Sequence, residues 1–252
     1  MEAYLKKIMA VLLLMGLLPA AQAYPVAWYA DLTTTGGGVQ NAPLNNWGNS
    51  YSYTDTAVTA NVTAWADAGD GLFQDAAVSL KAGGSGSCNE PENGNVANCL
   101  SGDNAARLDN KSQRDFLLIY FAPGQASDVV FDTLDIFTPK NNEFELTYWI
   151  GDLAGGPGSL DGASSDPALL GLTEAGTLSY TPPTNSKLDT IVNFNLNQSI
   201  TGNAILIGMS PSSSVTSEVY VNSLGATVPL PASVWLLMSA FGALGWFRQK
   251  AS

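Results

Sequence analysis

The sequence predicts an all-β protein, an antiparallel β-sandwich that is most similar to a jelly roll. Its body shows no sustained apolar repeat at the 3.6-residue helical period. Short runs rich in β-branched and aromatic residues recur instead, separated by Gly, Pro, Asn, Asp and Ser, which is typical of sandwiches. The expected strands are residues 27–32, 52–58, 62–66, 77–80, 115–121, 129–137, 144–150, 177–180, 190–196, 204–209 and 215–224.

Three of these runs also predict which faces are buried. Residues 132–137 and 143–148 alternate between apolar and polar, so one face of each strand should meet the core and the other should meet water. Residues 116–121 are apolar throughout, which suits a central strand covered on both sides. Long glycine-rich stretches are expected to be loops at the ends of the sandwich that pack no core: residues 35–49, 83–104 and 151–171.

The N-terminus has the three-part layout of a secretory signal peptide. Lys6 and Lys7 precede an apolar run at residues 8–18, and Ala21-Gln22-Ala23 follows as a small-residue cleavage site. The run is too short to span a membrane. We therefore expect residues 1–23 to be removed after Ala23, leaving Tyr24 as the first residue of a domain that extends to residue 227.

The two cysteines, Cys88 and Cys99, both lie in the part expected to be exported. In an oxidising compartment such a pair is most simply a disulfide, which would contribute about 3 kcal/mol on the chain-entropy model. A metal site is the alternative, but the chain has no histidine and no further thiol to complete it.

The absence of histidine also removes the Ser-His-Asp and Cys-His types of catalysis. Carboxylate chemistry remains: Glu143 and Glu145 should share one face of a strand beside Tyr148 and Trp149, as a glycosidase pair could. Two solvated glutamates on the wet face of an alternating strand explain the same pattern without catalysis. We favour this second interpretation and expect no enzyme activity.

Acidic loops raise the question of calcium, whose ligands are oxygen atoms. The two candidate groups do not match the Asp-x-Asp-x-Asp-Gly loop, and acidic residues that cap the backbone of their own turns explain them equally well. No other cofactor is expected. The first group is Asp67, Asp70 and Asp75, and the second is Asp152, Asp161 and Asp166.

Aromatic residues cluster early in the chain. Flat aromatic rings can stack on sugars, so a secreted carbohydrate-binding module is a second hypothesis for function; large aromatics are nevertheless more often core than ligand platforms. On this hypothesis, Trp47 or Trp65 would be needed for binding to a polysaccharide. The cluster consists of Trp28, Tyr29, Trp47, Tyr51, Tyr53 and Trp65.

The charge balance excludes one class of partner. The formal net charge is −12, and four of the 10 basic residues lie in the terminal segments, so the body is more acidic still. An acidic surface repels phosphate backbones, which makes nucleic acid an unsuitable partner.

The C-terminus ends in three parts in a fixed order. Val228-Pro229-Leu230-Pro231-Ala232 comes first, an uncharged run at residues 233–247 follows, and Arg248 and Lys250 close the chain. As a helix the run would cover about 23 Å, enough for a short membrane span whose basic end stays in the cytoplasm. A plain C-terminal membrane helix is one interpretation.

The order of these parts resembles a PEP-CTERM sorting signal of the Val-Pro-Leu-Pro-Ala type, over residues 228–252. Such signals are recognised by exosortases, membrane enzymes of Gram-negative bacteria. The resemblance implies export through the Sec translocon, a precursor held at the inner membrane by the C-terminal helix, processing near the motif, and a mature form at the cell surface or outside the cell.

A second, softer resemblance extends over residues 70–155. The cysteine loop, Arg107-Leu108-Asp109-Asn110, residues 115–121 and Tyr148-Trp149-Ile150-Gly151-Asp152 follow the order of elements in the exosortase-dependent surface protein families. A histidine expected before the Asp-Asn pair is missing. Together the resemblances imply a non-catalytic surface or matrix protein associated with exopolysaccharide or biofilm.

Overall fold

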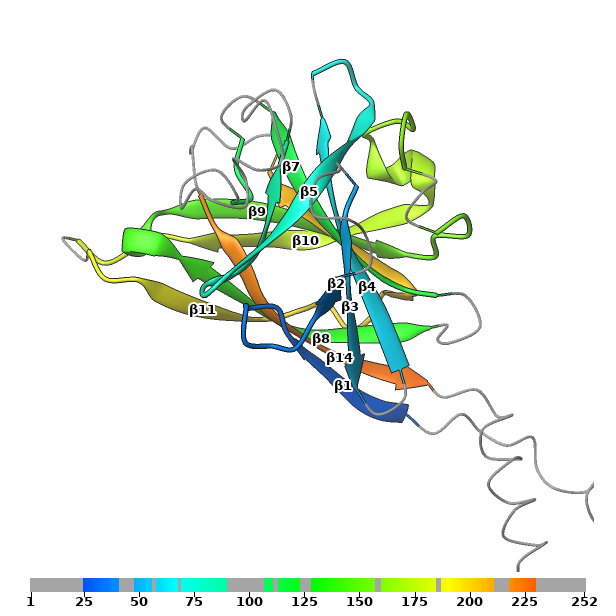
Figure 1. Cartoon of the computed structure of the whole chain (residues 1–252), viewed down its shortest axis with the longest axis horizontal. Helices are drawn as coiled ribbons and strands as arrows, with labels where there is room; N and C mark the ends of the chain where they lie inside the picture. The colour runs from blue at the N-terminus through cyan, green and yellow to red at the C-terminus, as the bar shows by residue number, and fades with distance from the viewer. Residues whose placement is uncertain are drawn as a thin grey trace, which may run out of the picture. The chain divides into compact units, whose positions relative to one another are not determined.

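The computed structural model describes residues 25–40, 48–55, 58–67, 69–89, 107–110, 113–122, 128–156, 160–184, 187–210 and 218–229. By its internal contacts the chain divides into two units, and the unit Val26–Val228 contains all but the outermost of these residues. The described part is all-β, with 14 strands hydrogen-bonded into one antiparallel sheet that folds over into two layers (Figure 1).

The first layer, sheet A, is built around β14 and β8, which pair from Tyr220↔Phe137 to Thr227↔Val130. β11 and the short β12 pair with β8 on its other side. β6 and β1 both pair with β14. The strands of sheet A are β1 (Pro25–Asp31), β6 (Gly84–Cys88), β8 (Val129–Thr138), β11 (Thr190–Asn195), β12 (Thr201–Gly202) and β14 (Tyr220–Pro229).

The second layer, sheet B, runs in the order β10-β9-β13-β7-β4, with β3 and β2 at its far edge. Its strands are β2 (Val39–Gln40), β3 (Ser50–Asp55), β4 (Val58–Asp67), β7 (Arg114–Phe121), β9 (Phe144–Gly151), β10 (Leu172–Tyr180) and β13 (Ala204–Met209). β5 (Phe73–Lys81) belongs to both layers, because it pairs with β4 of sheet B and with β6 of sheet A.

The main core lies between the layers. Trp28 of β1 meets Phe121 of β7 edge to face with ring centroids 4.9 Å apart, and Phe121 meets Phe131 of β8 at 6.1 Å. Farther along, Phe144 of β9 meets Phe194 of β11 at 6.0 Å. Such aromatic pairs contribute about 1 kcal/mol each beyond their burial.

A second core covers the outer face of sheet B. Phe116, Leu118 and Tyr120 of β7 point away from the main core and pack with Trp149. Leu153, Leu160 and Leu172, from the segment between β9 and β10 and from the start of β10, complete this cluster. The prediction that β7 is covered on both sides is therefore confirmed, since residues 115–121 are all buried.

The loop predictions were wrong in two places, because both segments contain residues that are buried in the fold. The segment at 151–171 packs a core through Leu153 and Leu160, and it contains a 3₁₀ helix, η3 (Pro167–Leu170). The segment at 83–104 contains β6, whose sequence Gly-Ser-Gly-Ser-Cys has no large apolar residue yet is buried throughout. Small residues are required there because a Cβ at Gly84 would overlap the Val221 carbonyl.

Most other strand predictions are confirmed to within a few residues, but the last strand lies closer to the C-terminus than expected. The strand expected at 215–224 is β14, and it continues through Val228, which is fully buried, to Pro229. The first two residues of the Val-Pro-Leu-Pro-Ala motif therefore belong to the last strand. A second 3₁₀ helix, η1 (Pro139–Asn141), joins β8 to β9.

Candidate functional site

The line along which sheet B turns over into sheet A is called the seam here, and its two halves differ. In one half, β4, β5, β6 and β14 are joined by successive ladders, so backbone hydrogen bonds cross from one sheet to the other. In the other half, β1 of sheet A and β3 of sheet B face each other as edge strands. Among the described strands, β1 pairs only with β14, and β3 pairs only with β2 and β4.

The closed half is completed by one side chain, Asn49. Its amide nitrogen donates to the Val78 carbonyl at 3.0 Å, and its Oδ1 accepts from the Val78 N–H at 2.6 Å. Gly48 N–H also donates to the Ala76 carbonyl at 3.1 Å. Asn49 is fully buried and takes the place of a backbone partner for β5 where β3 begins.

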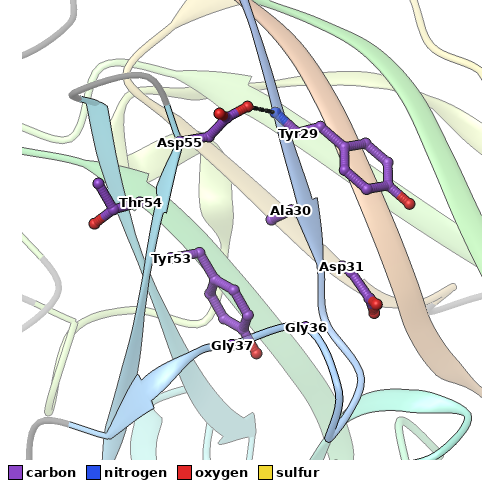
Figure 2. A pocket seen from close by; sticks show the side chains of 8 residues that line it. All are labelled: Tyr29, Ala30, Asp31, Gly36, Gly37, Tyr53, Thr54 and Asp55. Atoms are coloured by element: carbon purple, nitrogen blue, oxygen red, sulfur yellow. Dashed lines mark hydrogen bonds between the residues drawn. The ribbon is translucent and has the colours of Figure 1, made fainter.

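The open half holds a cleft of about 330 Å³ between the free edges of β1 and β3 (Figure 2). This volume lies at the lower end of the range for small-molecule sites, roughly 300–1,000 Å³. A glycine-rich turn closes one end. The lining residues are Tyr29, Ala30, Asp31, Gly36, Gly37, Tyr53, Thr54 and Asp55.

Strand alternation places the β1 residues of the cleft. Ala30 is buried between Tyr29 and Asp31, which project to the other side of the strand (Figure 2). Tyr29 is 55% exposed and is the one large aromatic residue among the exposed hydrophobic residues that the structure describes. The ring is therefore open to solvent beside the cleft, on the side of β1 that faces away from Tyr53 (Figure 2).

Two carboxylates line the cleft, and each uses one oxygen to hold the backbone. Asp55 Oδ2 accepts from the Tyr29 N–H at 3.1 Å, which satisfies a donor on the free edge of β1 (Figure 2). Asp31 Oδ1 accepts from the Thr33 N–H at 2.9 Å and shapes the turn that follows. Thr54 pairs with Thr59 at 2.8 Å through their hydroxyls.

Tyr53 reaches the cleft from β3, with its ring directed toward Gly37 (Figure 2). The side chain is only 3% exposed, and its hydroxyl has no hydrogen-bond partner among the described residues. The pKa of Tyr53 is raised to about 12, chiefly by burial, with smaller contributions from the neighbouring Tyr51 and Asp31. The Ser85 hydroxyl acts in the opposite direction on this pKa, but its own proton goes to the Leu32 carbonyl at 3.0 Å.

The glycine turn is built around this tyrosine. A Cβ at Gly38 would lie 2.6 Å from Tyr53 Cζ, closer than any real contact, so no larger residue fits without moving the ring. Gly36 lies against the Asp31 carbonyl in the same way. Gly37 has φ +73, a left-handed conformation that favours glycine. The cleft therefore combines an exposed ring, an unpartnered hydroxyl and carboxylate acceptors.

The structure does not bring Glu143 and Glu145, the alternative glycosidase pair, to the cleft. Glu143 is exposed just before the strand and accepts from the Thr181 hydroxyl at 3.3 Å, and Glu145 is half-buried. The aromatic residues expected beside them are core residues: Tyr148 is 3% exposed and Trp149 is 5% exposed.

The candidate calcium residues mostly cap backbone in the structure. Asp67 accepts from Gly69 N–H, Asp70 from Leu72 N–H, and Asp166 from Ala168 N–H. Asp152 accepts from the Asn203 N–H at 3.0 Å. Burial raises the pKa of Asp75, and the charge of Asp161 adds to the rise. Over the described residues, no three acidic or cysteine side chains are grouped as a metal site.

The aromatic cluster is divided by the structure. Trp28, Tyr51, Tyr53 and Trp65 are 2–8% exposed, so the prediction that Trp65 serves as a ligand platform is wrong: it packs in the second core. Tyr29 is the exposed member. Trp47 lies outside the described residues.

Most of the predicted processing residues also lie outside the described part of the chain. These are Ala23, Tyr24, Leu230, Pro231, Ala232, Arg248 and Lys250, and Cys99 lies outside it as well. Cys88 is buried, and no described cysteine is a free thiol. Its pairing with Cys99 stays a prediction. Among the described residues there is no helix that is both long and apolar enough to cross a membrane.

Sequence reasoning missed Asn49, Asp55 and Asp31 because their roles depend on partners in other strands. Asn49 meets a residue 29 positions away, and Asp55 meets one 26 positions away. The one local signal was the alternation in β3, where Tyr51 and Tyr53 occupy inward positions.

No protein-family model matches the chain, and no curated protein matches it at a significant level. Among solved structures, a family 29 carbohydrate-binding module from Piromyces equi is 7% identical over 80% of this chain and 90% of its own, with a TM-score of 0.28. The C-terminal domain of a chitobiase from Bacteroides fragilis is 9% identical over 46% of this chain and 64% of its own, with a TM-score of 0.29.

A third structure, the module CBM32-3 from a family 31 glycoside hydrolase of Clostridium perfringens, is 11% identical over 46% of this chain and 67% of its own. Its TM-score is 0.26. Similarity at this level does not establish a shared ligand or a shared site.

Proposed function

We propose that this chain is an exported, non-catalytic surface protein whose β-sandwich binds carbohydrate in the open half of the seam. One observation carries the binding proposal. The cleft between β1 and β3 combines the exposed ring of Tyr29 with the buried Tyr53 hydroxyl, which has no hydrogen-bond partner among the described residues. Leaving a buried polar group unpaired costs about 1–3 kcal/mol, so a partner supplied by a ligand would offset that cost.

The chemistry of the cleft fits a sugar. A pyranose ring has an apolar C–H face that an exposed tyrosine can cover, and a rim of hydroxyls that need acceptors. Asp31 and Asp55 each use one carboxylate oxygen for a backbone N–H, which leaves the other oxygen for a ligand hydroxyl. The open edges of β1 and β3 add backbone groups of both kinds.

A binding role suits these carboxylates better than a catalytic one. Each is held in place by a backbone N–H, and Asp55 in particular fixes the distance between β1 and β3. The chain contains no histidine to serve as a general base. Glu143 and Glu145, the alternative pair, do not line the cleft.

Export and sorting rest on the two ends of the chain. We propose cleavage after Ala23, delivery by the Sec translocon, and recognition of Val228-Pro229-Leu230-Pro231-Ala232 by an exosortase. The mature protein would then be found at the cell surface or outside the cell, in contact with exopolysaccharide. Because Val228 is buried in β14, processing that leaves the body folded must occur beyond Pro229.

Affinity electrophoresis in gels containing a neutral polysaccharide tests the binding proposal. Wild-type protein should be retarded by at least one polymer, and Tyr29→Ala should lose about fivefold or more in affinity, since an aromatic contact contributes about 0.5–1.5 kcal/mol beyond its buried area. Ile191→Ala is the matched control, because Ile191 is a similarly exposed apolar residue on β11 of sheet A. Equal retardation of the two variants would refute binding at the cleft.

Deleting Leu230 to Ala232, while keeping Pro229 and β14 intact, tests sorting. The deletion should leave the protein in the inner membrane of a host that has an exosortase. The unaltered chain in a host without the exosortase should behave in the same way. Normal surface delivery of the deletion variant would contradict recognition of the motif.

A further inference from the structure

The charges around the cleft restrict the kind of carbohydrate that it can hold. Its lining contains two carboxylates, on Asp31 and Asp55, and no basic side chain. The described basic residue that contacts the turn after Asp31 is Lys81, whose carbonyl accepts from the Thr34 N–H at 3.2 Å, and its side chain is not among those that line the cleft. Arg107 and Arg114 pair with Glu218 and Asp67, which do not line the cleft either. The cleft therefore presents negative charge without a compensating cation among the residues that line it.

The hydrogen-bonding groups point to the same restriction. A carboxylate oxygen only accepts, so the free oxygens of Asp31 and Asp55 require donors from the ligand. The phenol of Tyr53 stays protonated at neutral pH, since burial raises its pKa to about 12, and it can give its proton to a ligand oxygen. Neutral sugar hydroxyls supply both a donor and an acceptor. A uronate carboxylate supplies acceptors alone.

The size of the electrostatic repulsion predicts how strongly the cleft distinguishes neutral polymers from acidic ones. Two like charges about 4 Å apart repel by about 1 kcal/mol even in bulk water and by more at a protein surface, which corresponds to at least about a fivefold loss in affinity per pair. A ligand carboxylate that approaches both Asp31 and Asp55 this closely should therefore be disfavoured by more than tenfold. The net charge of −12 on the whole chain acts in the same direction.

From these observations we infer that the cleft selects an uncharged polysaccharide and excludes acidic ones such as uronates. This inference rests on the proposed function of the same cleft. It adds that the negative charges of Asp31 and Asp55 repel acidic sugars, an effect that we call the charge filter, while the same carboxylates accept hydrogen bonds from neutral ones. It implies that the exopolysaccharide partner is a neutral polymer.

The experiment compares galactomannan with alginate, each in affinity gels at about 150 mM salt, where exposed charges beyond about 8 Å are screened. Wild-type protein should be retarded by galactomannan and not by alginate. The double variant Asp31→Asn with Asp55→Asn keeps an oxygen acceptor for the Thr33 and Tyr29 N–H groups. In this variant the ratio of galactomannan affinity to alginate affinity should fall at least tenfold.

The matched control removes the same two charges elsewhere. Asp70 and Asp166 are both exposed, and each accepts one backbone N–H, as the cleft carboxylates do. The double variant Asp70→Asn with Asp166→Asn should keep the wild-type ratio. Thermal melting of both double variants verifies that each one folds.

The outcomes separate the two proposals. Retardation of wild-type protein by alginate, abolished in Tyr29→Ala, would overturn the charge filter and leave carbohydrate binding at the cleft standing. An unchanged affinity ratio in the Asp31 and Asp55 variant would also overturn the filter. The gels also include the other neutral polysaccharides of the binding test, and failure of wild-type protein to bind any of these polymers or alginate would overturn both the filter and the proposed function.

Discussion

The two halves of the seam solve one structural problem in opposite ways. Each must connect the edge of sheet A to the edge of sheet B. In the closed half, Asn49 donates to and accepts from Val78, and the ladders of β5 and β6 continue across. In the open half, Asp55 accepts one N–H from Tyr29, and Trp28 Nε1 donates to the Val58 carbonyl at 3.3 Å.

The difference lies in what each bridging side chain can do. An amide can both donate and accept, so Asn49 satisfies both backbone groups of Val78, and its complete burial keeps it from a ligand. A carboxylate only accepts, so Asp55 satisfies a donor of β1 and leaves the rest of that edge open. The closed half therefore serves stability, and the open half is available for binding.

Removing the bridge of the closed half should have the largest effect. Asn49→Ala leaves the buried N–H and carbonyl of Val78 without partners, which should lower the free energy of unfolding by about 3 kcal/mol. Asp55→Ala, the matched change in the open half, should cost about 1 kcal/mol because water can reach Tyr29 N–H. Urea denaturation measures both. Equal losses would show that the two halves do not differ in this way.

The sequence predicted the strands of this comparison better than it predicted the seam. Alternation located β8 and β9, and the unbroken apolar run located β7, because both patterns are local. β6 escaped detection, since its burial depends on close backbone contact with β14 through Gly84 rather than on apolar side chains.

The candidate site was predictable only in part. The early aromatic cluster contained both Tyr29 and Tyr53, but the sequence could not tell the exposed ring from buried ones such as Trp65. That distinction depends on which strand is at an edge, and edges are set by pairings between residues far apart in sequence. Asp55 and Asn49 have no local signature for the same reason.

Overpacking the glycine turn should affect the open half alone. In Gly38→Ala the new methyl group would overlap the Tyr53 ring, so the free energy of unfolding should fall by about 1–3 kcal/mol and polysaccharide binding should be lost. Gly162→Ala is the control: Gly162 has φ +69 with open space around it, so strain of about 1 kcal/mol should appear without loss of binding. Intact binding by the Gly38 variant would contradict the role given to Tyr53.

The two halves should also differ in their dependence on pH: stability should change with pH through a group beside the closed half, and binding in the open half should not. The group is Asp109, whose carbonyl accepts from the Asp115 N–H. The Asp115 carboxylate in turn accepts from Ser87 and Asn89 at the end of β6, which places Asp109 beside the closed half. Burial raises the pKa of Asp109 from 3.8 to about 6, and Arg107 offsets part of this rise.

A raised carboxyl pKa means that the folded state holds its proton more tightly than the unfolded state. The contribution of Asp109 to stability should therefore decrease as pH rises from about 4 to about 6 and stay level above that. Asp109→Asn should remove this slope, measured as the difference in urea midpoint between pH 4 and pH 7. The opposite slope would contradict the assignment. Binding in the open half should not change from pH 7 to pH 9, because the pKa of Tyr53 is about 12.

The most direct test of the open half as a binding site is Tyr53→Phe, measured for both stability and affinity. A hydroxyl without a partner contributes nothing to folding, so its removal should leave the free energy of unfolding unchanged or raise it by up to about 1 kcal/mol. Titration calorimetry with a neutral polysaccharide should show affinity falling about fivefold to tenfold. A loss of more than about 1 kcal/mol in stability with unchanged affinity would contradict the account, because the hydroxyl would then serve the fold and not a ligand.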